Sequence, residues 1–203
     1  MSELDELNAH YDAMPPVAAM RIRATAYDGD CLRLHAPLAS NVNDKDCAFG
    51  GSLASIMTLA GWGLLTLRLG DAGIDSDVYV ADSQIRYLRP LFTDLEAEAR
   101  LADDVDWDAV QRAWRERGRA RASIVSRVLG PDGAPVAELG VEFVEVDQPH
   151  HHQAADRTKL LAANDFTQVR QEVLAAGQAG GHDVLDHQHL GAGFQPEPAA
   201  QFE

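Results

Sequence analysis

Residues 49–69 read FGGSLASIMTLAGWGLLTLRL, and this stretch decides the fold. It is too long for a strand, and its apolar residues do not alternate with polar ones, so it predicts a helix over residues 50–69. Small residues such as Ala54, Gly61 and Gly63 allow other backbone to approach this helix from most directions. A helix that is apolar on nearly every side belongs in the middle of a domain.

Alternating apolar and polar residues predict strands on both sides of this helix. The predicted strands span residues 17–27, 31–36, 78–89, 95–101, 120–128 and 137–143. Short helices are predicted over residues 3–13, ended by Pro15-Pro16, and over 106–117, closed by Gly118. Two strands before a buried helix and four after it predict an α+β domain, in which a curved antiparallel sheet wraps around one central helix. Because the edges of such a sheet require a partner, we expect a dimer.

Composition disfavours several classes of partner. The chain has 203 residues and a formal charge of −15, which argues against nucleic acid and against an anionic membrane. Cys31 and Cys47 are too few for a disulfide framework or a zinc site. The first 14 residues are acidic and lack the apolar core of a signal peptide. Since the apolar residues 53–67 also fall short of the ~20 that a spanning helix needs, we expect a cytoplasmic protein.

The composition changes near Gln148 and divides the chain in two. Residues 1–147 carry the predicted domain, whereas residues 148–203 are rich in Ala, Gln, Gly and His and hold six of the eight histidines. Such a segment cannot bury much apolar surface, so we expect a largely disordered tail with one possible short helix over residues 165–176. Flexible His-rich tails bind metal weakly, and we predict no functional metal site.

Two motifs carry a resemblance to a known family. Residues 41–53 read NVNDKDCAFGGSL, and residues 82–90 read DSQIRYLRP. With the element order, these motifs resemble the hot-dog fold of acyl-thioester enzymes, and most closely the putative thioesterase domain at the C-terminus of YiiD-type proteins. The resemblance covers residues 10–146. It implies a role in fatty acid metabolism without a cofactor, and a homodimer or dimer of dimers that binds an acyl-CoA or acyl-carrier-protein thioester at the subunit interface.

The resemblance also implies an oxyanion site at the start of the central helix. Related thioesterases open this helix with His-Gly-Gly, and here the residues are Phe49-Gly50-Gly51. Glycine lets a substrate carbonyl approach the backbone, and the free amides of a helix start donate to an oxygen that becomes negative. We therefore predict the Gly51 amide, followed by that of Gly50, as the oxyanion donor. Close packing between helix and sheet is the alternative reason for these glycines.

The usual general base of related thioesterases is replaced in this chain. Many relatives place a catalytic aspartate nine residues after the first residue of the motif, where this chain has Thr58. Threonine cannot act as a base near neutral pH unless another group takes its proton. Asn43 matches an asparagine that orients water in some relatives, and its alternative role is to cap the loop. Asp44, Asp46 and Asp82 are the carboxylates available, with solvated charges as the alternative for the first two.

For substrate binding we assign Asp44, Phe49, Ser52, Tyr87 and Arg89. Arginine binds the phosphates of CoA well, but a solvated strand face is the alternative for Arg89. Ser52 has the alternative of a backbone hydrogen bond in the first helical turn, and Tyr87 that of a core position. The predicted activity is thioester hydrolysis. The alternative is a hot-dog protein that binds acyl-CoA without hydrolysing it, which the threonine at the usual acid position favours.

Overall fold

The computed structural model describes residues 2–146. Its helices are α1 (Glu3–Ala13), α2 (Pro15–Met20), α3 (Gly50–Asp71) and α4 (Trp107–Arg117), with a 3-10 turn at Leu38–Ser40. Its strands are β1 (Arg23–Tyr27), β2 (Leu32–Ala36), β3 (Asp77–Tyr87), β4 (Leu95–Leu101), β5 (Arg119–Leu129) and β6 (Pro135–Val146). The predicted tail over residues 148–203, with its helix over 165–176, lies outside the described residues.

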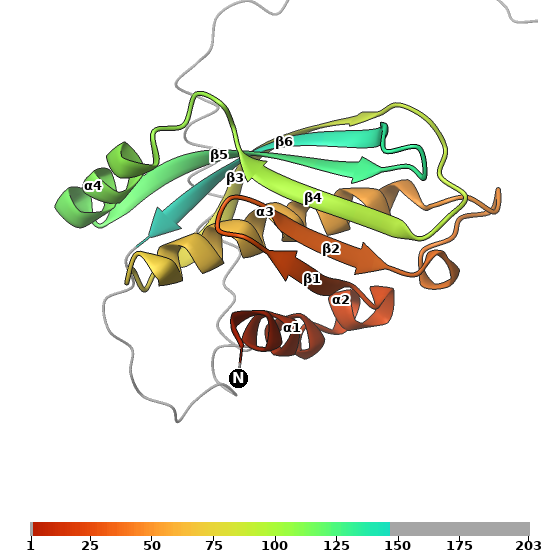
Figure 1. The fold of residues 1–203 in the computed structure, drawn as a ribbon, viewed down its shortest axis with the longest axis horizontal. Helices are drawn as coiled ribbons and strands as arrows, with labels where there is room; N and C mark the ends of the chain where they lie inside the picture. Colours follow the sequence, from red (N-terminus) through yellow and green to blue (C-terminus); the bar gives the residue numbers. More distant parts are fainter. Residues whose placement is uncertain (1, 147–203) are drawn as a thin grey trace, which may run out of the picture. The chain divides into compact units, whose positions relative to one another are not determined.

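The six strands form one antiparallel sheet in the order β1-β2-β4-β5-β6-β3. Helix α3 crosses one face of the sheet, and α1 packs beside β1 (Figure 1). This confirms the predicted α+β architecture of a curved antiparallel sheet around one central helix. Strand β3 follows α3 in the chain but lies beside β6, so β1 and β3 are the two edges of the sheet.

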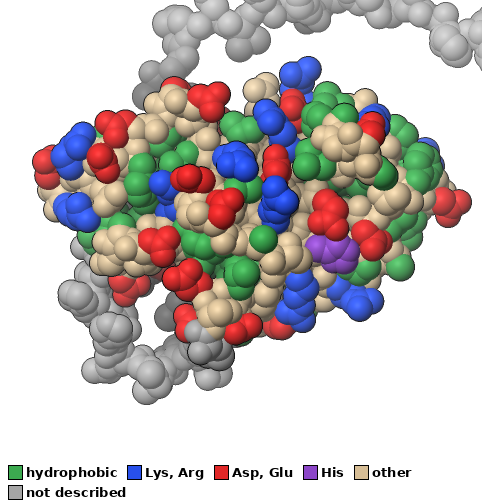
Figure 2. Space-filling view, in the orientation of Figure 1, with side chains coloured by type: hydrophobic (Ala, Val, Ile, Leu, Met, Phe, Trp, Pro, Cys, Tyr) green, Lys and Arg blue, Asp and Glu red, His purple; other side chains and the backbone are tan. Residues whose placement is uncertain are grey.

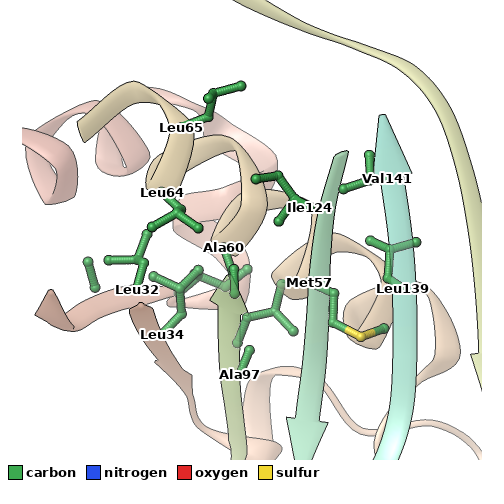
Figure 3. Packing of buried hydrophobic residues seen from close by; sticks show 14 of the residues in the cluster. Leu32, Leu34, Met57, Ala60, Leu64, Leu65, Ala97, Ile124, Leu139 and Val141 are labelled. Atoms are coloured by element: carbon green, nitrogen blue, oxygen red, sulfur yellow. The ribbon is translucent and has the colours of Figure 1, made fainter. Parts of the chain in front are cut away.

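The core lies between α3 and the inner face of the sheet. Met57, Ala60 and Leu64 of α3 are fully buried and belong to one cluster with the inward-facing residues of β2, β4, β5 and β6 (Figure 3). Gly61 brings the helix close to the sheet, because a Cβ there would lie 3.0 Å from the Phe143 ring. The predicted close packing of small residues on this helix is therefore present in its middle turns.

Helix α3 is longer than the apolar stretch suggested from the sequence. Its 22 residues are long and apolar enough, by length and composition alone, to cross a membrane. Half of its most apolar window is nevertheless buried inside the fold, as expected of a helix that fills the core of a domain. The burial assigns α3 to the core.

One predicted strand is wrong in its first half. Residues 17–20 are helical and belong to α2, so the first strand begins only at Arg23. Pro15 and Pro16 occupy the first positions of α2, where a missing N–H costs nothing and the fixed φ favours a helix. Arg21 ends α2 in the left-handed conformation, with φ of 56°.

The two edges of the sheet are built differently. On β1, the Asn8 side chain of α1 donates to the carbonyl of Ala24 (3.0 Å) and accepts from its amide (2.8 Å). These backbone groups point away from β2, so Asn8 occupies the place of a neighbouring strand. The middle of β3 is exposed, and Tyr79 and Val80 are each about half exposed. The β3 edge has no such cover from the described part of the chain.

Candidate active site

The first turn of α3 presents free backbone amides. Phe49 is the N-cap residue, and no side chain caps this end of the helix. The first amide that bonds back along the helix is that of Leu53, to the carbonyl of Phe49 (3.0 Å). The amides of Gly50, Gly51 and Ser52 are therefore the groups that a helix start leaves without an intrahelical partner. Together with the helix dipole they favour a negative charge at this position.

A buried asparagine that the sequence analysis missed fixes the approach to this helix. The Asn41 carbonyl accepts from the Phe49 amide (2.7 Å), and its side-chain amide donates to the carbonyls of Met20 and Pro37 (2.9 Å each). Asn41 is 2% exposed. The preceding amide, that of Ala48, donates to the carbonyl of Leu91 (2.8 Å), so hydrogen bonds from two different segments hold the chain before α3.

Two aromatic side chains flank the glycines. The Tyr87 hydroxyl donates to the carbonyl of Gly50 (3.1 Å), which joins the end of β3 to the start of α3. The Phe49 ring lies against Gly51, and a Cβ on Gly51 would collide with it. Both aromatic residues are more than half exposed. The two rings thus occupy the space beside the glycines, and Leu88, next to Tyr87 in the chain, is also exposed.

The hydroxyl groups further along α3 bond to its own backbone. Thr58 donates to the carbonyl of Ala54 (2.9 Å), and Ser55 donates to that of Gly51 (2.8 Å). Thr58 lies two turns below Gly51 on the same face, since seven residues are close to two full turns. Ser52 is buried, at 5% exposure. The Thr58 hydroxyl is a donor in this arrangement and has no acidic neighbour that accepts its proton among the described contacts.

Polar side chains in the loop before α3 form hydrogen bonds within the loop itself. The Asn43 Oδ1 accepts from the amides of Lys45 (2.8 Å) and Cys47 (3.3 Å), which is the loop-capping role considered as its alternative. Asp44 is exposed and contacts Lys45 (3.4 Å). Asp46 adopts the left-handed conformation at φ of 59°. None of these three side chains has a described contact with the glycines of α3.

A β-bulge decides which way Asp82 points. Val80 pairs with the inward-facing Phe143, but a register shift follows and Asp82 pairs with Glu142. The extra residue at the shift reverses the alternation of the strand. Asp82 therefore lies on the outer face, whereas Tyr87, which contacts Gly50, lies on the inner face. The structure does not bring the Asp82 carboxylate and the start of α3 together.

Arg89 binds to the turn between β5 and β6. Its guanidinium pairs with Asp132 and donates to the carbonyl of Ala134 (2.8 Å) in the turn between β5 and β6. The hydrogen bond from Arg89 holds the pKa of the Asp132 carboxyl below its usual range, and the amide of Ala134 adds to this. The described contacts of the Arg89 guanidinium are thus with the turn between β5 and β6, two residues beyond the end of β3.

The outer face of the sheet carries paired charges. Arg121 contacts Glu142, and Arg127 lies 3.4 Å from Glu138. Basic and acidic side chains are interleaved over the face seen in Figure 2. Arg121 and Arg127 are thus part of a solvated strand face with paired charges. Within residues 2–146, no three His, Cys, Asp or Glu side chains gather in a way that could hold a metal ion.

A family model and a solved structure identify the same group of proteins. Residues 4–146 match the protein family described as putative thioesterase (yiiD_Cterm). A solved structure of a putative thioesterase from Shewanella oneidensis is 30% identical with a TM-score of 0.64, over 71% of this chain and 97% of that one. A protein of unknown function from Chlorobaculum tepidum is 25% identical with a TM-score of 0.67, over 71% and 94% of the two chains.

A curated relative has a different description. The chain is 27% identical over 146 residues to a protein from Dechloromonas aromatica described as an arginine–tRNA ligase. The match covers 70% of this chain and 25% of that protein, so the chain spans about a quarter of the length of this relative. The description therefore concerns a much longer protein.

Proposed function

Because the chain belongs to the putative thioesterase family YiiD_C and has the hot-dog fold of its structural neighbours, we propose that it hydrolyses acyl thioesters of CoA or of an acyl carrier protein. The observation that carries this proposal is the uncapped start of α3, where the amides of Gly50 and Gly51 lie between two exposed rings. A thioester carbonyl is a neutral acceptor that becomes an oxyanion during attack, and free amides at a helix start stabilise that charge.

The proposed reaction follows from this geometry. Water attacks the thioester carbon, a C–O bond forms, and the Gly51 amide, aided by that of Gly50, donates to the oxyanion. The tetrahedral intermediate then collapses and the C–S bond breaks. One proton of the attacking water ends on the thiolate, and the other passes to solvent as the acid leaves as a carboxylate. The Phe49 ring lies where a Gly51 Cβ would stand, and this ring is more than half exposed, so we propose that it turns aside when the carbonyl approaches the Gly51 amide.

The open β3 edge supports a homodimer as the working unit. Tyr79, Val80 and Tyr87 are each about half exposed along this strand, and an edge of this length invites pairing with another strand. An isologous contact between two β3 edges produces an antiparallel pair, since the same residues meet across a two-fold axis. In this dimer the start of α3, which Tyr87 ties to β3, lies at the subunit boundary.

A second candidate function is binding of acyl-CoA without turnover. It is favoured by the described carboxylates Asp44, Asp46 and Asp82, none of which contacts the start of α3, and by the Thr58 hydroxyl, which donates to its own helix. Hydrolysis by this site therefore depends on stabilising the oxyanion, or on a base from the second subunit.

One assay separates the two functions. The purified full chain is mixed with acyl-CoA and acyl-carrier-protein thioesters of increasing chain length, and the released thiol is trapped. We expect hydrolysis above background, and a loss of about 10- to 100-fold in Gly51→Ala, because a Cβ there collides with the Phe49 ring and stands beside the amide that we propose as the oxyanion donor. Gly140→Ala is the matched control, since a Cβ at that position meets no atom within 4 Å.

The contrary outcome is also defined. No hydrolysis with any thioester rejects the proposed activity. If acyl-CoA still raises the melting temperature of the chain, the second candidate is supported, because a ligand that binds only the folded state stabilises it.

A further inference from the structure

A groove opens on the side of α3 that faces away from the sheet. It has a volume of about 550 Å³ and is bounded by α1, by the second half of α3 and by the start of β3. Leu7, Trp62, Leu67 and Val78 give it an apolar lining. Its volume falls within the usual range for small-molecule sites, about 300–1,000 Å³, and its apolar lining is also typical of such sites.

Trp62 is the fixed wall of this groove. Its indole N–H donates to the carbonyl of Val78 (3.2 Å), so the side chain joins α3 to β3. The His10 ring of α1 stacks on it, with 5.0 Å between centroids and 20° between planes. A ring held by two other elements is a preorganised contact for a hydrocarbon chain.

The rim of the groove is acidic. Glu3, Glu6, Asp71 and Asp77 line it, and no lysine or arginine is among the described residues that do so. The Asp71 carboxylate accepts from the hydroxyl of Tyr27 (2.7 Å) and is held in place. Carboxylates around a groove with low-dielectric walls create a negative potential that disfavours an anionic ligand group.

The position of the groove along β3 relates it to a second subunit. Trp62 bonds to the Val78 end of β3, whereas Gly50 bonds to the Tyr87 end. In an antiparallel pair of β3 edges, the Tyr87 end of one strand lies beside the Asp77 end of the other. The start of the partner's α3 is thereby brought to this groove. Within one chain, Gly51 and Trp62 are separated by about 16 Å of helix, at 1.5 Å per residue.

We propose that this groove holds the acyl chain of a thioester whose carbonyl lies on the partner's Gly51, and that its acidic rim selects acyl chains that do not end in a carboxylate. The inference rests on the proposed function and names its substrate class: aliphatic acyl groups are accepted, and dicarboxylic acyl groups are rejected. The apolar lining contacts the hydrocarbon, and Glu3 and Glu6 repel a second carboxylate.

The first experiment compares two substrates of equal length. We expect kcat/KM for octanoyl-CoA to exceed that for suberoyl-CoA, its eight-carbon dicarboxylic counterpart, by at least tenfold. Glu3→Gln/Glu6→Gln narrows the ratio several-fold, while the control Asp103→Asn/Asp108→Asn, which removes the same charge from exposed positions outside the groove, leaves it unchanged. Equal rates for the two substrates, or equal effects of both double variants, overturn the proposal.

The second experiment asks whether the groove acts in the other subunit. Thr66→Phe fills the groove from the exposed side of α3, and Gly51→Ala disables the helix start. Co-expression with two affinity tags isolates the mixed dimer. If groove and amide come from different subunits, this dimer regains one intact site and up to half of the wild-type activity. If both come from one subunit, each site keeps one defect and activity is not regained, which overturns the shared arrangement.

A binding measurement keeps the groove testable without turnover. Octyltrimethylammonium and octanoate are titrated into the full chain, with tryptophan fluorescence and calorimetry as readouts. We expect the cation to bind at least tenfold more tightly, and Thr66→Phe to abolish binding of both. If the cation binds as expected but no thioester is hydrolysed, the proposed hydrolytic activity is rejected, whereas the proposal that the groove binds aliphatic chains is supported. Octanoate binding as tightly as the cation, or binding of neither probe, overturns the groove itself.

Discussion

The two edge strands of the sheet differ in how they are protected: β1 is covered by a side chain of α1, whereas β3 is exposed. Strand β1 has five residues, carries a register shift after Ala24 and is closed by the side chain of Asn8. Strand β3 has eleven residues, and most of its length is exposed, including Tyr79 and Val80. Short strands, bulges and side-chain cover are the usual means of protecting an edge, and a long apolar edge without cover invites another strand.

The difference shows which edge the chain completes by itself. The N-terminal helix supplies Asn8 to β1, so that side of the sheet needs no other molecule. The β3 side lacks an equivalent within residues 2–146, and it carries Tyr87, which contacts the start of α3. The β1 edge is therefore protected by a side chain of the same chain. For the β3 edge, we propose that a second copy of the chain provides the cover, next to the candidate active site.

The most severe test introduces a charge on the open edge. Val80→Lys places an ammonium group on the inner face of β3, next to the edge along which we propose that the partner's β3 pairs. We expect the dimer to weaken by at least about 100-fold, because an unpaired charge in an apolar contact costs several kcal/mol. Sedimentation velocity over a concentration series measures this. Thr25→Lys on the closed edge is the control, and equal sedimentation of both variants with the wild type contradicts the proposed interface.

A second test opens the closed edge. Asn8→Ala removes both hydrogen bonds to Ala24 and leaves a buried amide and carbonyl without partners. We expect the free energy of unfolding in urea to fall by about 2–3 kcal/mol, the usual cost of unsatisfied buried groups. The exposed Arg112→Ala on α4 is expected to cost less than about 0.5 kcal/mol. A loss for Asn8→Ala as small as that of the control shows that β1 does not depend on this side chain.

A third test concerns the joint between the open edge and the helix. Tyr87→Phe removes the hydrogen bond to Gly50 but keeps the ring. We expect kcat/KM to fall about fivefold, equivalent to about 1 kcal/mol, with an unchanged dimer. Arg86→Gln, on the same strand but on its outer face, serves as the comparison. Equal activity of both variants separates the Tyr87 hydroxyl from the reaction.

The mildest effect is expected just beyond the end of β3. Since the pKa of Asp132 is lowered by its hydrogen bond from Arg89, the ionised carboxylate stabilises the folded state. This contribution is present above the ordinary carboxyl pKa of about 4 and is lost as the pH falls through the lower folded value. Asp132→Asn should therefore lower the melting temperature slightly at pH 6, and by progressively less as the pH falls below about 4. A difference that persists in acid excludes this ion pair as its cause.

Much of the fold was predictable because it follows from local periodicity. The apolar run of α3 and the alternation in β4 and β5 predicted their elements to within a few residues. The error at α2 arose because the alanines and Met20 mimic a strand period, while the two prolines start a helix. The role of Asn8 carries no signal in the sequence, since its partner Ala24 lies 16 residues away, and one partner of Asn41, Met20, lies 21 residues away.

The candidate site was predictable where it depends on the helix start. Gly50 and Gly51 come from the first motif, residues 41–53, and Tyr87 comes from the second, residues 82–90. In the structure Tyr87 contacts Gly50, which is next to Gly51. The direction of Asp82 was not predictable, because one extra residue in β3 reverses the face on which it lies. Alternation along a strand cannot reveal a bulge, which becomes visible only through the register with β6.

The pairing of β3 with β6 also has a consequence for the order of folding. The hairpins β1–β2 and β5–β6 close over short turns, whereas β3 meets a strand made much later in the chain. Contacts between distant segments pay a larger loop-closure entropy and form more slowly. We expect β3 to be anchored only after β6 has been synthesised, so that an unfinished chain on the ribosome does not yet offer the surface that recognises a second copy.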